Sequence, residues 1–272
     1  MITFPNAKIN IGLFVTERRN DGFHNIETIF FPLNFTDILE IQNIHEQEKT
    51  TFINTGIPVD ANPLDNLCYK AYKKLKEDYN LPPVSIHLHK LIPFGSGLGG
   101  GSSDAAYSLY TLNSIFNLKL SSSDLSAYAE EIGSDCPFFL YNKPAYAYEK
   151  GNRLSSVSLN LKGYYILLVV PEIQVSTKLA YKNVIPHKRD SSLKTIIENT
   201  PVAQWKNTII NDFEKSIFKH YPVLQEIKKG LYDSGAEFAA MSGSGSGMFG
   251  IFKKQPDCAG KFKNMLIWQQ QL

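Results

Sequence analysis

The sequence of 272 residues has few cysteines, little net charge and no long apolar run. Its three cysteines, Cys68, Cys136 and Cys258, are odd in number and widely spaced, which argues against a disulfide framework or a cysteine metal site and favours a reducing compartment. A formal net charge of +2 is too small to indicate nucleic acid or an anionic membrane as a partner. The longest apolar run, residues 164–170, is far too short to span a membrane. Because structured sequence begins close to Met1, with no signal peptide, we expect a cytoplasmic protein.

The most informative stretch covers residues 84–116, which we predict to form a strand, a glycine loop and a helix. Apolar and polar residues alternate through 84–89, which is typical of a half-buried strand. Five glycines follow within 95–101, and then Ser102 or Ser103 is the predicted N-cap of a helix. The chain length allows one large domain or two modest ones with a substantial core.

A glycine loop that leads into a helix favours the binding of an anion. The first amide groups of a helix have no intrahelical partners, the helix dipole is positive there, and glycine allows the backbone to approach a ligand closely. A tight flexible turn is the alternative interpretation, but two or three glycines would suffice for it. Five glycines followed by two serines therefore indicate a polyphosphate site.

Several known phosphate loops do not fit this stretch. Gly95-x-Gly97-x-x-Gly100 matches the dinucleotide fingerprint formally, but no acidic residue closes a second strand about twenty residues later. The Walker pattern requires a lysine where Ser102 stands. An oxidoreductase with a dinucleotide at this loop is a remote alternative, which NAD(P) binding in place of ATP would reveal.

Two charged residues outside the loop stand in positions that allow more than one interpretation. Lys8 and Asn10 share one face of a predicted strand within residues 2–15, and periodicity alone favours a solvated lysine there. Asp135 lies between a helix end at Gly133 and a predicted apolar strand. It could be a turn aspartate that caps the next segment or binds a backbone amide, or it could have a chemical role, and the local pattern leaves both open.

The C-terminal half contains a second glycine segment, at residues 242–247. A flexible linker often has such alternating glycine and serine residues. Here the segment separates two short predicted strands, 238–241 and 248–252, so a loop that lines a site is favoured. We also predict helical segments at 202–220 and 261–268.

These motifs together resemble those of the GHMP kinases. Residues 93–103 resemble the phosphate loop of that family, and the triple glycine before Ser-Ser-Asp-Ala-Ala is most similar to the branch that phosphorylates 4-diphosphocytidyl-2-C-methyl-D-erythritol. Pro-Asn-Ala-Lys-Ile-Asn at 5–10, Gly-Ser-Asp-Cys-Pro-Phe-Phe at 133–139 and the glycine segment at 242–247 resemble further motifs in the same order. The similarity extends from Pro5 to about Phe252.

The resemblance implies an α+β fold with two domains. Residues 1–156 would form an ATP-binding domain like domain 2 of ribosomal protein S5, and residues 157–272 a ferredoxin-like substrate domain. The implied activity is ATP-dependent phosphorylation of the 2-hydroxyl of 4-diphosphocytidyl-2-C-methyl-D-erythritol in the non-mevalonate route to isoprenoid precursors. Mg²⁺ with ATP is expected from the chemistry, although its ligands are not evident. His87 and His89 share a strand face without a third ligand nearby, so we interpret them as structural.

The resemblance also implies roles for individual residues. Lys8 would lie beside the transferred phosphoryl group and Asp135 would be the catalytic base. The residues expected to bind ATP are Pro93, Phe94, Gly95, Ser96, Gly97, Leu98, Gly99, Gly100, Gly101, Ser102 and Ser103. Those expected to bind the substrate are Asn10, Phe23, His24, Thr177, Tyr181 and Gly243, with Phe23 standing where the family has a tyrosine.

Two further alternatives remain. A GHMP kinase that acts on a different small alcohol would not require cytosine in its substrate. A non-catalytic nucleotide-binding module would hold ATP without turnover, although intact Lys8 and Asp135 argue against it.

Overall fold

The computed structural model describes residues 1–44, 49–58, 62–258 and 260–272. Two compact units are present, each assembled from three segments. Unit 1 consists of Met1–Ala7, Pro32–Phe94 and Gly99–Lys143, and unit 2 consists of Lys8–Phe31, Gly95–Leu98 and Pro144–Leu272. The single division expected at residues 156/157 stays a prediction. Among the described residues, no helix has both the length and the apolar character that crossing a membrane requires.

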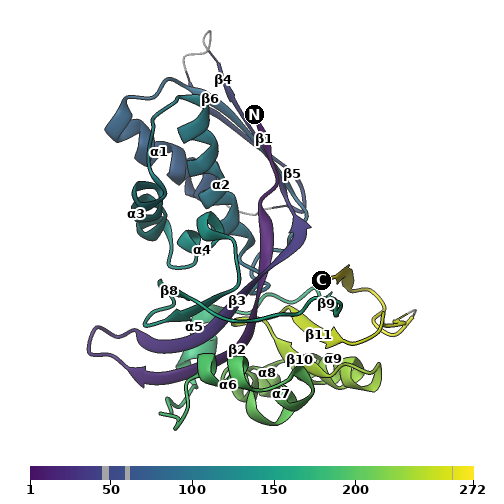
Figure 1. Cartoon of the computed structure of the whole chain (residues 1–272). Coiled ribbons are helices and arrows are strands. Elements are labelled where there is room, and N and C mark those ends of the chain that lie inside the picture. Colours follow the sequence, from purple (N-terminus) through teal and green to yellow (C-terminus); the bar gives the residue numbers. More distant parts are fainter. Residues whose placement is uncertain (45–48, 59–61, 259) are drawn as a thin grey trace. The chain divides into compact units, whose positions relative to one another are not determined.

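Unit 1 contains a four-stranded sheet in the order β1-β4-β6-β5, in which β4 pairs antiparallel with β1 and β6 while β5 pairs parallel with β6. Helices α1 and α2 pack side by side on one face of this sheet (Figure 1). The elements are β1 (Ile2–Thr3), β4 (Ile38–Asn43), β5 (Thr51–Gly56), the 3₁₀ turn η1 (Pro63–Asp65), α1 (Leu67–Tyr79), β6 (Val84–Lys90), α2 (Gly100–Ile115), α3 (Ser122–Ile132) and α4 (Cys136–Tyr141).

The core of unit 1 follows from the alternation of its strands. Along β6, every second residue from Val84 is buried and the residues between them are half-buried, which confirms the strand expected there. Ile86 and Leu88 pack with Leu75 of α1 and Leu109 of α2 in one apolar cluster. The sheet therefore buries one face against the helices. Strand β6 ends at Lys90, shortly before the glycine loop.

Unit 2 contains two sheets and five helices among its described residues. The strand orders are β2-β3-β7-β8 and β10-β11-β9-β12, and every pair recorded in the second sheet is antiparallel. The strands are β2 (Asn6–Arg18), β3 (His24–Thr36), β7 (Ala145–Tyr148), β8 (Arg153–Ser156), β9 (Tyr165–Val170), β10 (Phe238–Met241), β11 (Met248–Phe252) and β12 (Leu266–Gln271). Residues 6–7 of β2 and 32–36 of β3 belong to unit 1. The helices are α5 (Thr177–Lys182), α6 (Leu193–Asn199), α7 (Val202–Thr208), α8 (Glu214–His220) and α9 (Pro222–Asp233).

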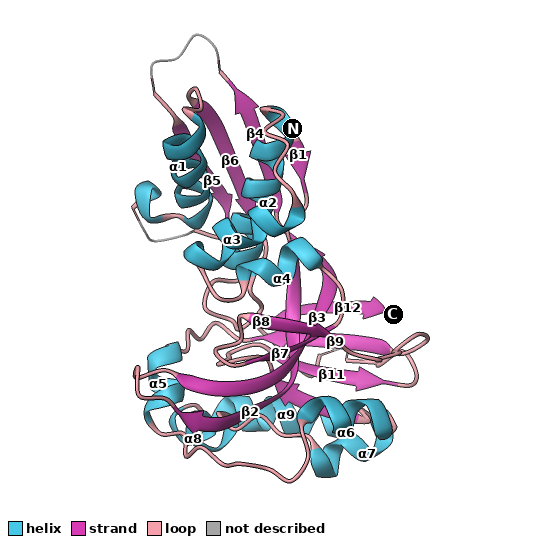
Figure 2. Ribbon diagram, turned by 60° about the vertical axis from the view of Figure 1, so that its left-hand side comes forward, coloured by secondary structure: helices cyan, strands magenta, loops and turns pink. Residues whose placement is uncertain are grey.

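The core of unit 2 centres on β9, which lies between β11 and β12 (Figure 2). Leu167 and Val169 of this strand pack with Ile217 of α8 and with Leu224 and Ile227 of α9. Strands β10 and β11 pair next to them and are joined by residues 242–247. The second glycine segment therefore leaves and re-enters a buried sheet, which confirms that it is no free linker.

Most of the expected elements are present, and the exceptions share a cause. The helix expected at 261–268 is wrong, because Leu266–Gln271 pairs with β9 as a strand. The apolar strand expected after Asp135 is also wrong, because Cys136–Tyr141 forms the helix α4. Short apolar runs suit either structure, and the partner available in the fold decides between them. The helical stretch expected at 202–220 is two helices, α7 and α8.

We expect Leu168→Ala to lower the free energy of unfolding by about 2–5 kcal/mol, because this side chain is completely buried in the central strand β9 and its removal leaves a cavity. Ile267→Ala on the neighbouring strand β12 is the matched control. The Ile267 side chain is 41% exposed, and we expect its removal to change the free energy of unfolding by less than about 1 kcal/mol. Urea unfolding followed by circular dichroism measures both. Equal losses in the two variants would contradict this assignment of the core.

Candidate functional site

The first part of the site is the loop Gly95–Leu98, which is held by backbone contacts within unit 2. The amide of Lys8 donates to the carbonyl of Leu98 at 2.9 Å, and the amide of Gly247 donates to the carbonyl of Ser96 at 2.9 Å. The hydroxyl of Ser242 donates to the carbonyl of Gly97 at 2.9 Å. The loop is thus anchored on one side by β2 and on the other by the second glycine segment.

Glycine is required at position 97 by both its backbone angle and its surroundings. Gly97 has φ +74°, in the left-handed region that side chains rarely adopt. A Cβ atom at this position would lie 2.0 Å from the carbonyl oxygen of Ser242. The two glycine segments, which are about 145 residues apart in sequence, approach each other so closely that no side chain fits between them.

Lys8 of β2 is buried at this contact. Its ammonium donates to Asn10 Oδ1 at 2.5 Å and to the carbonyl of Gly97 at 3.1 Å, and it lies 4.9 Å from the centroid of the Phe30 ring. The residue is only 3% exposed, so the solvated lysine that periodicity alone favoured is wrong. Both faces of β2 are buried from Asn6 to Val15, which the alternation of residue types does not reveal.

Asn10 connects Lys8 to the second glycine segment. Its backbone amide donates to Ser242 Oγ at 3.1 Å, and its side-chain amide donates to Thr28 Oγ1 at 2.9 Å. A Cβ atom at Gly243 would lie 3.1 Å from Asn10 Oδ1. The structure therefore brings together three predicted site residues, Lys8, Asn10 and Gly243, with the loop Gly95–Leu98.

The second glycine segment is positioned by residues whose contribution sequence reasoning missed. Asn211 is 2% exposed, and its side-chain amide donates to the carbonyl of Met241 at 2.8 Å and to that of Gly243 at 2.7 Å. Glu214 accepts from the amide of Met241 at 2.8 Å and pairs with Lys228 at 2.6 Å. Burial raises the pKa of Glu214. The only sequence signal for this role is the three polar residues among 211–214, directly before a helix.

In unit 1, helix α2 begins earlier than expected. The N-cap is Gly99, with φ +72°, rather than Ser102 or Ser103, and the helix starts at Gly100 without a side-chain cap. The amides of the first helical residues have no intrahelical acceptor and are available to an anion. The hydroxyl of Ser103 is fully buried and has no hydrogen-bond partner among the described residues. An orphaned donor in the first turn is consistent with a phosphate or a metal ligand there.

Asp135 precedes helix α4 in unit 1 and is half-buried. Its side chain makes no capping hydrogen bond to this helix, so the interpretation of Asp135 as a capping turn residue is wrong. The hydroxyl of Ser134 donates to Asp135 Oδ1 at the long distance of 3.5 Å.

Two of the residues expected to contact a base form an aromatic stack in unit 2. The rings of His24 and Tyr181 are stacked with centroids 5.0 Å apart, and Tyr181 meets Phe213 edge-on at 4.8 Å. Burial lowers the pKa of His24, and nearby Arg18 lowers it further, so the ring is neutral at pH 7. Phe23 is 59% exposed, with the Lys150 ammonium 5.1 Å from its ring centroid.

Thr177 and the pair His87 and His89 of β6 are the remaining residues that the sequence singles out. Thr177 Oγ1 lies 3.2 Å from Ser244 Oγ, which places it beside the second glycine segment. Thr55 Oγ1 hydrogen-bonds to both His87 and His89 at 2.9 Å, in agreement with a structural role. Within the described residues, no group of three or more His, Cys, Asp or Glu side chains is arranged to hold a metal ion.

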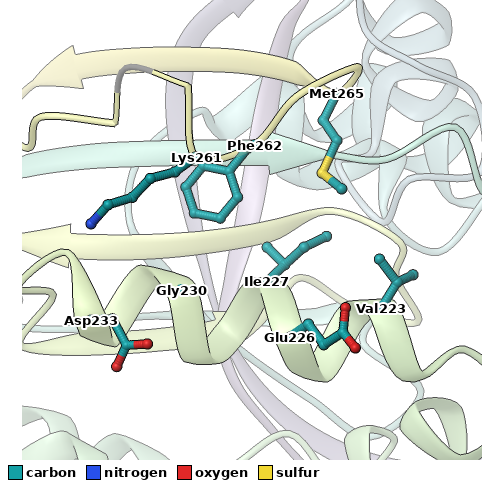
Figure 3. Close-up of a pocket in the computed structure, with 8 residues that line it drawn as sticks. All are labelled: Val223, Glu226, Ile227, Gly230, Asp233, Lys261, Phe262 and Met265. Carbon is teal, nitrogen blue, oxygen red and sulfur yellow. The ribbon is translucent and has the colours of Figure 1, made fainter.

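A separate cavity of about 280 Å³ lies in unit 2 between α9 and the segment that leads to β12 (Figure 3). Its floor is apolar, with Ile227, Phe262 and Met265, and Glu226 and Asp233 stand at its edge. None of the residues that line it is a predicted site residue. The glycine segments and this cavity are therefore different features of unit 2.

Comparison with protein families gives two matches. Residues 66–143 match the GHMP kinases N-terminal domain, and residues 196–263 match the GHMP kinases C-terminal domain. The chain is 52% identical over 256 residues to the 4-diphosphocytidyl-2-C-methyl-D-erythritol kinase of Bacteroides fragilis, covering 94% of this chain and 93% of that one. It is 49% identical over 274 residues to the kinase of the same name from Parabacteroides distasonis, covering 100% of both chains.

Solved structures agree with these matches. A crystal structure of 4-(cytidine 5'-diphospho)-2C-methyl-D-erythritol kinase superposes with a TM-score of 0.82 at 31% identity, covering 99% of this chain and 98% of that one. A homoserine kinase from Cytophaga hutchinsonii has a TM-score of 0.68 at 16% identity, covering 98% and 94% of the two chains, and this likeness concerns the fold alone.

We expect Gly97→Ala to weaken ATP binding at least about tenfold, because the new methyl group would overlap the carbonyl of Ser242 and force the loop to shift, together with the Gly97 carbonyl that accepts from Lys8. Gly22→Ala is the matched control, since Gly22 also has a positive φ, +84°, but has open space around it. Isothermal titration calorimetry with ATP compares the two. An equal loss in both variants would show that backbone strain, and not the close approach, is responsible.

Proposed function

The chain belongs to the GHMP kinases, and from this membership we propose that it transfers the γ-phosphoryl group of ATP to the 2-hydroxyl of 4-diphosphocytidyl-2-C-methyl-D-erythritol. This reaction is a step of the methylerythritol phosphate route to isoprenoid precursors. The observation that carries the proposal is 49–52% identity, over at least 93% of each chain, to relatives that bear the name of this kinase. The α+β, two-domain fold expected for the family is confirmed by the solved relative with a TM-score of 0.82.

GHMP kinases use ATP as the phosphate donor, and the proposed ATP-binding residues run from Pro93 to Ser103. Phosphoryl transfer depends on positioning and on charge stabilisation more than on covalent help from the protein. The amides at the start of α2 would face the phosphates, where the positive end of the helix dipole adds to their effect. Glycine at 99, 100 and 101 leaves this turn without side chains that would keep a phosphate away.

We propose that Mg²⁺ accompanies ATP and that Ser103 holds it. The buried, unpartnered hydroxyl of Ser103 supports this choice, because hydroxyl oxygens are suitable ligands for a hard cation. Mg²⁺ usually keeps several water molecules and relies on phosphate oxygens, so it does not need a cluster of carboxylates. Bound in this way, the ion would neutralise charge on the phosphates.

Lys8 is proposed to stabilise the charge that develops on the transferred phosphoryl group. The ammonium donates to two neutral oxygens, those of Asn10 and Gly97, and is removed from bulk water. A charge in such surroundings acts more strongly than one in solvent. Its position is set by β2 and by the glycine loop together, so little reorganisation is needed when the phosphates arrive.

Asp135 is proposed to accept or orient the proton of the 2-hydroxyl. Its half-buried place directly before α4, within the motif Gly-Ser-Asp-Cys-Pro-Phe-Phe at 133–139, supports this role. In a loose transition state the attacking hydroxyl needs little help from a base until late in the reaction. Orientation of the hydroxyl and acceptance of its proton are therefore both compatible with the proposal.

For the acceptor, we propose that the stacked rings of His24 and Tyr181 contact the cytosine base. A neutral imidazole beside a tyrosine offers an aromatic face and hydrogen-bonding nitrogens. Phe23 would add a further ring, without the hydroxyl of the family's tyrosine. Asn10, Thr177 and Gly243 are proposed to contact the diphosphate and the erythritol hydroxyls.

The proposal extends to the division of the chain into domains, to its compartment and to its partners. Residues 1–156 would form the ATP-binding domain and residues 157–272 the substrate domain. The enzyme would act in the cytoplasm on a small molecule, without nucleic acid as a partner, which the net charge of +2 supports.

The direct test is ATP consumption by the purified protein with 4-diphosphocytidyl-2-C-methyl-D-erythritol, compared with mevalonate, homoserine and galactose. We expect turnover with the cytidyl substrate alone, because only that substrate carries a base for His24 and Tyr181. Turnover with another of these alcohols would reject the substrate while keeping a kinase. Absence of turnover with all four would reject the proposed function.

We expect Asp135→Asn to lower kcat by at least about 10²–10³-fold while the protein remains folded, because the amide cannot accept the hydroxyl proton. Lys8→Met should cause a loss of similar size. Asp233→Asn on α9 is the control, since that carboxylate is exposed and pairs with Lys229 on its own helix. Wild-type turnover in Asp135→Asn would remove Asp135 from the mechanism.

A further inference from the structure

Unit 1 contains a buried cluster of three charged side chains that the proposed mechanism does not use. The ammonium of Lys90 lies 2.5 Å from Asp37 Oδ2 and 2.8 Å from Asp104 Oδ2. All three side chains are at most 4% exposed. Burying charges costs free energy even when they are paired. Well-packed apolar residues in their place often give a protein of equal or greater stability. Stability alone therefore does not account for the cluster.

The three residues come from the two ends of the glycine loop and from a neighbouring strand. Lys90 is the last residue of β6, and Asp104 is the fifth residue of α2. Asp37 Oδ1 accepts from the amides of Leu91 at 2.6 Å and Ile92 at 2.9 Å. The residues just before the loop and the residue just after it thus meet on one cluster, which closes the loop at its base.

The cluster also lies directly against the first residue of α2. A Cβ atom at Gly100 would lie 3.1 Å from Lys90 Nζ and 2.9 Å from Ile92 Cγ2. Because residue 100 is a glycine, the first residue of α2 can lie in close contact with the Lys90 ammonium. A shift of Lys90 would therefore move the helical turn whose amides face the anion.

We propose that Lys90, Asp37 and Asp104 are positioning residues for phosphoryl transfer, which clamp the two ends of the phosphate loop and hold the first turn of α2 in place for ATP. This inference rests on the proposed function, because it concerns the same loop. The ammonium acts through Asp104 and Gly100 and touches no reacting atom. Because the loop is already held in its binding conformation, less conformational entropy is lost when ATP binds.

The test compares three variants with the wild type by Tm and by steady-state kinetics. Lys90→Met alone leaves two buried carboxylates together and is expected to fold poorly. The double variant Lys90→Met/Asp104→Leu replaces the pair between β6 and α2 by apolar groups and is expected to fold. If the clamp positions ATP, the KM for ATP in the double variant rises about tenfold or more, while the KM for the cytidyl substrate stays within about twofold.

Asp104→Asn is the conservative variant, because the amide oxygen can still accept a hydrogen bond from Lys90. If this hydrogen bond between β6 and α2 positions ATP, we expect the KM for ATP of Asp104→Asn to stay within about twofold of the wild type. Lys74→Met removes an exposed ion pair with Glu131 in the same unit and serves as the control for a general loss of charge.

Two outcomes would overturn the inference. A double variant with a changed Tm but an unchanged KM for ATP would show that the cluster serves stability alone. A KM for ATP that rises as much in Asp104→Asn as in the double variant would show that the hydrogen bond between Lys90 and Asp104 does not position ATP. Titration calorimetry with ATP on the same variants needs no acceptor substrate, so it tests the clamp even if the proposed acceptor proves to be wrong.

Discussion

The close approach of Gly97 to the carbonyl of Ser242 is the constraint on which the arrangement of unit 2 depends. A side chain at position 97 would overlap this carbonyl, so the first glycine segment can pack on the second only without one. The same contact places the Gly97 carbonyl where it accepts from both Ser242 and Lys8. The glycines of the two segments therefore allow a close packing of backbone, and flexibility is not their purpose.

Buried charges support both glycine segments. In unit 1, Lys90 joins Asp37 and Asp104 at the base of the first segment. In unit 2, Glu214 accepts the amide of Met241, the residue before the second segment, and pairs with Lys228. Each arrangement costs desolvation and gives in return a fixed geometry for a backbone that has few side chains of its own. Electrostatic catalysis requires such rigidity, because donors that must reorganise lose much of their effect.

Local patterns sufficed to predict the elements whose signal is contained in a few residues. The alternation of β6 and the short strands β10 and β11 on either side of the second glycine segment are examples, because each depends on neighbours in sequence. The predictions failed at α4 and β12. Both are short apolar stretches whose structure depends on what they pack against, and β9 supplies a strand edge that makes Leu266–Gln271 a strand.

The sequence by itself determined the two glycine segments and the family, because these rest on residue types at fixed spacing. Only the tertiary structure decided that Lys8 is buried, that Asn10 links it to Ser242, and that His24 stacks on Tyr181. Their partners lie far away in the chain. Burial of a strand on both faces and hydrogen bonds across more than a hundred residues leave no periodic trace in a single sequence, because packing of distant segments creates them.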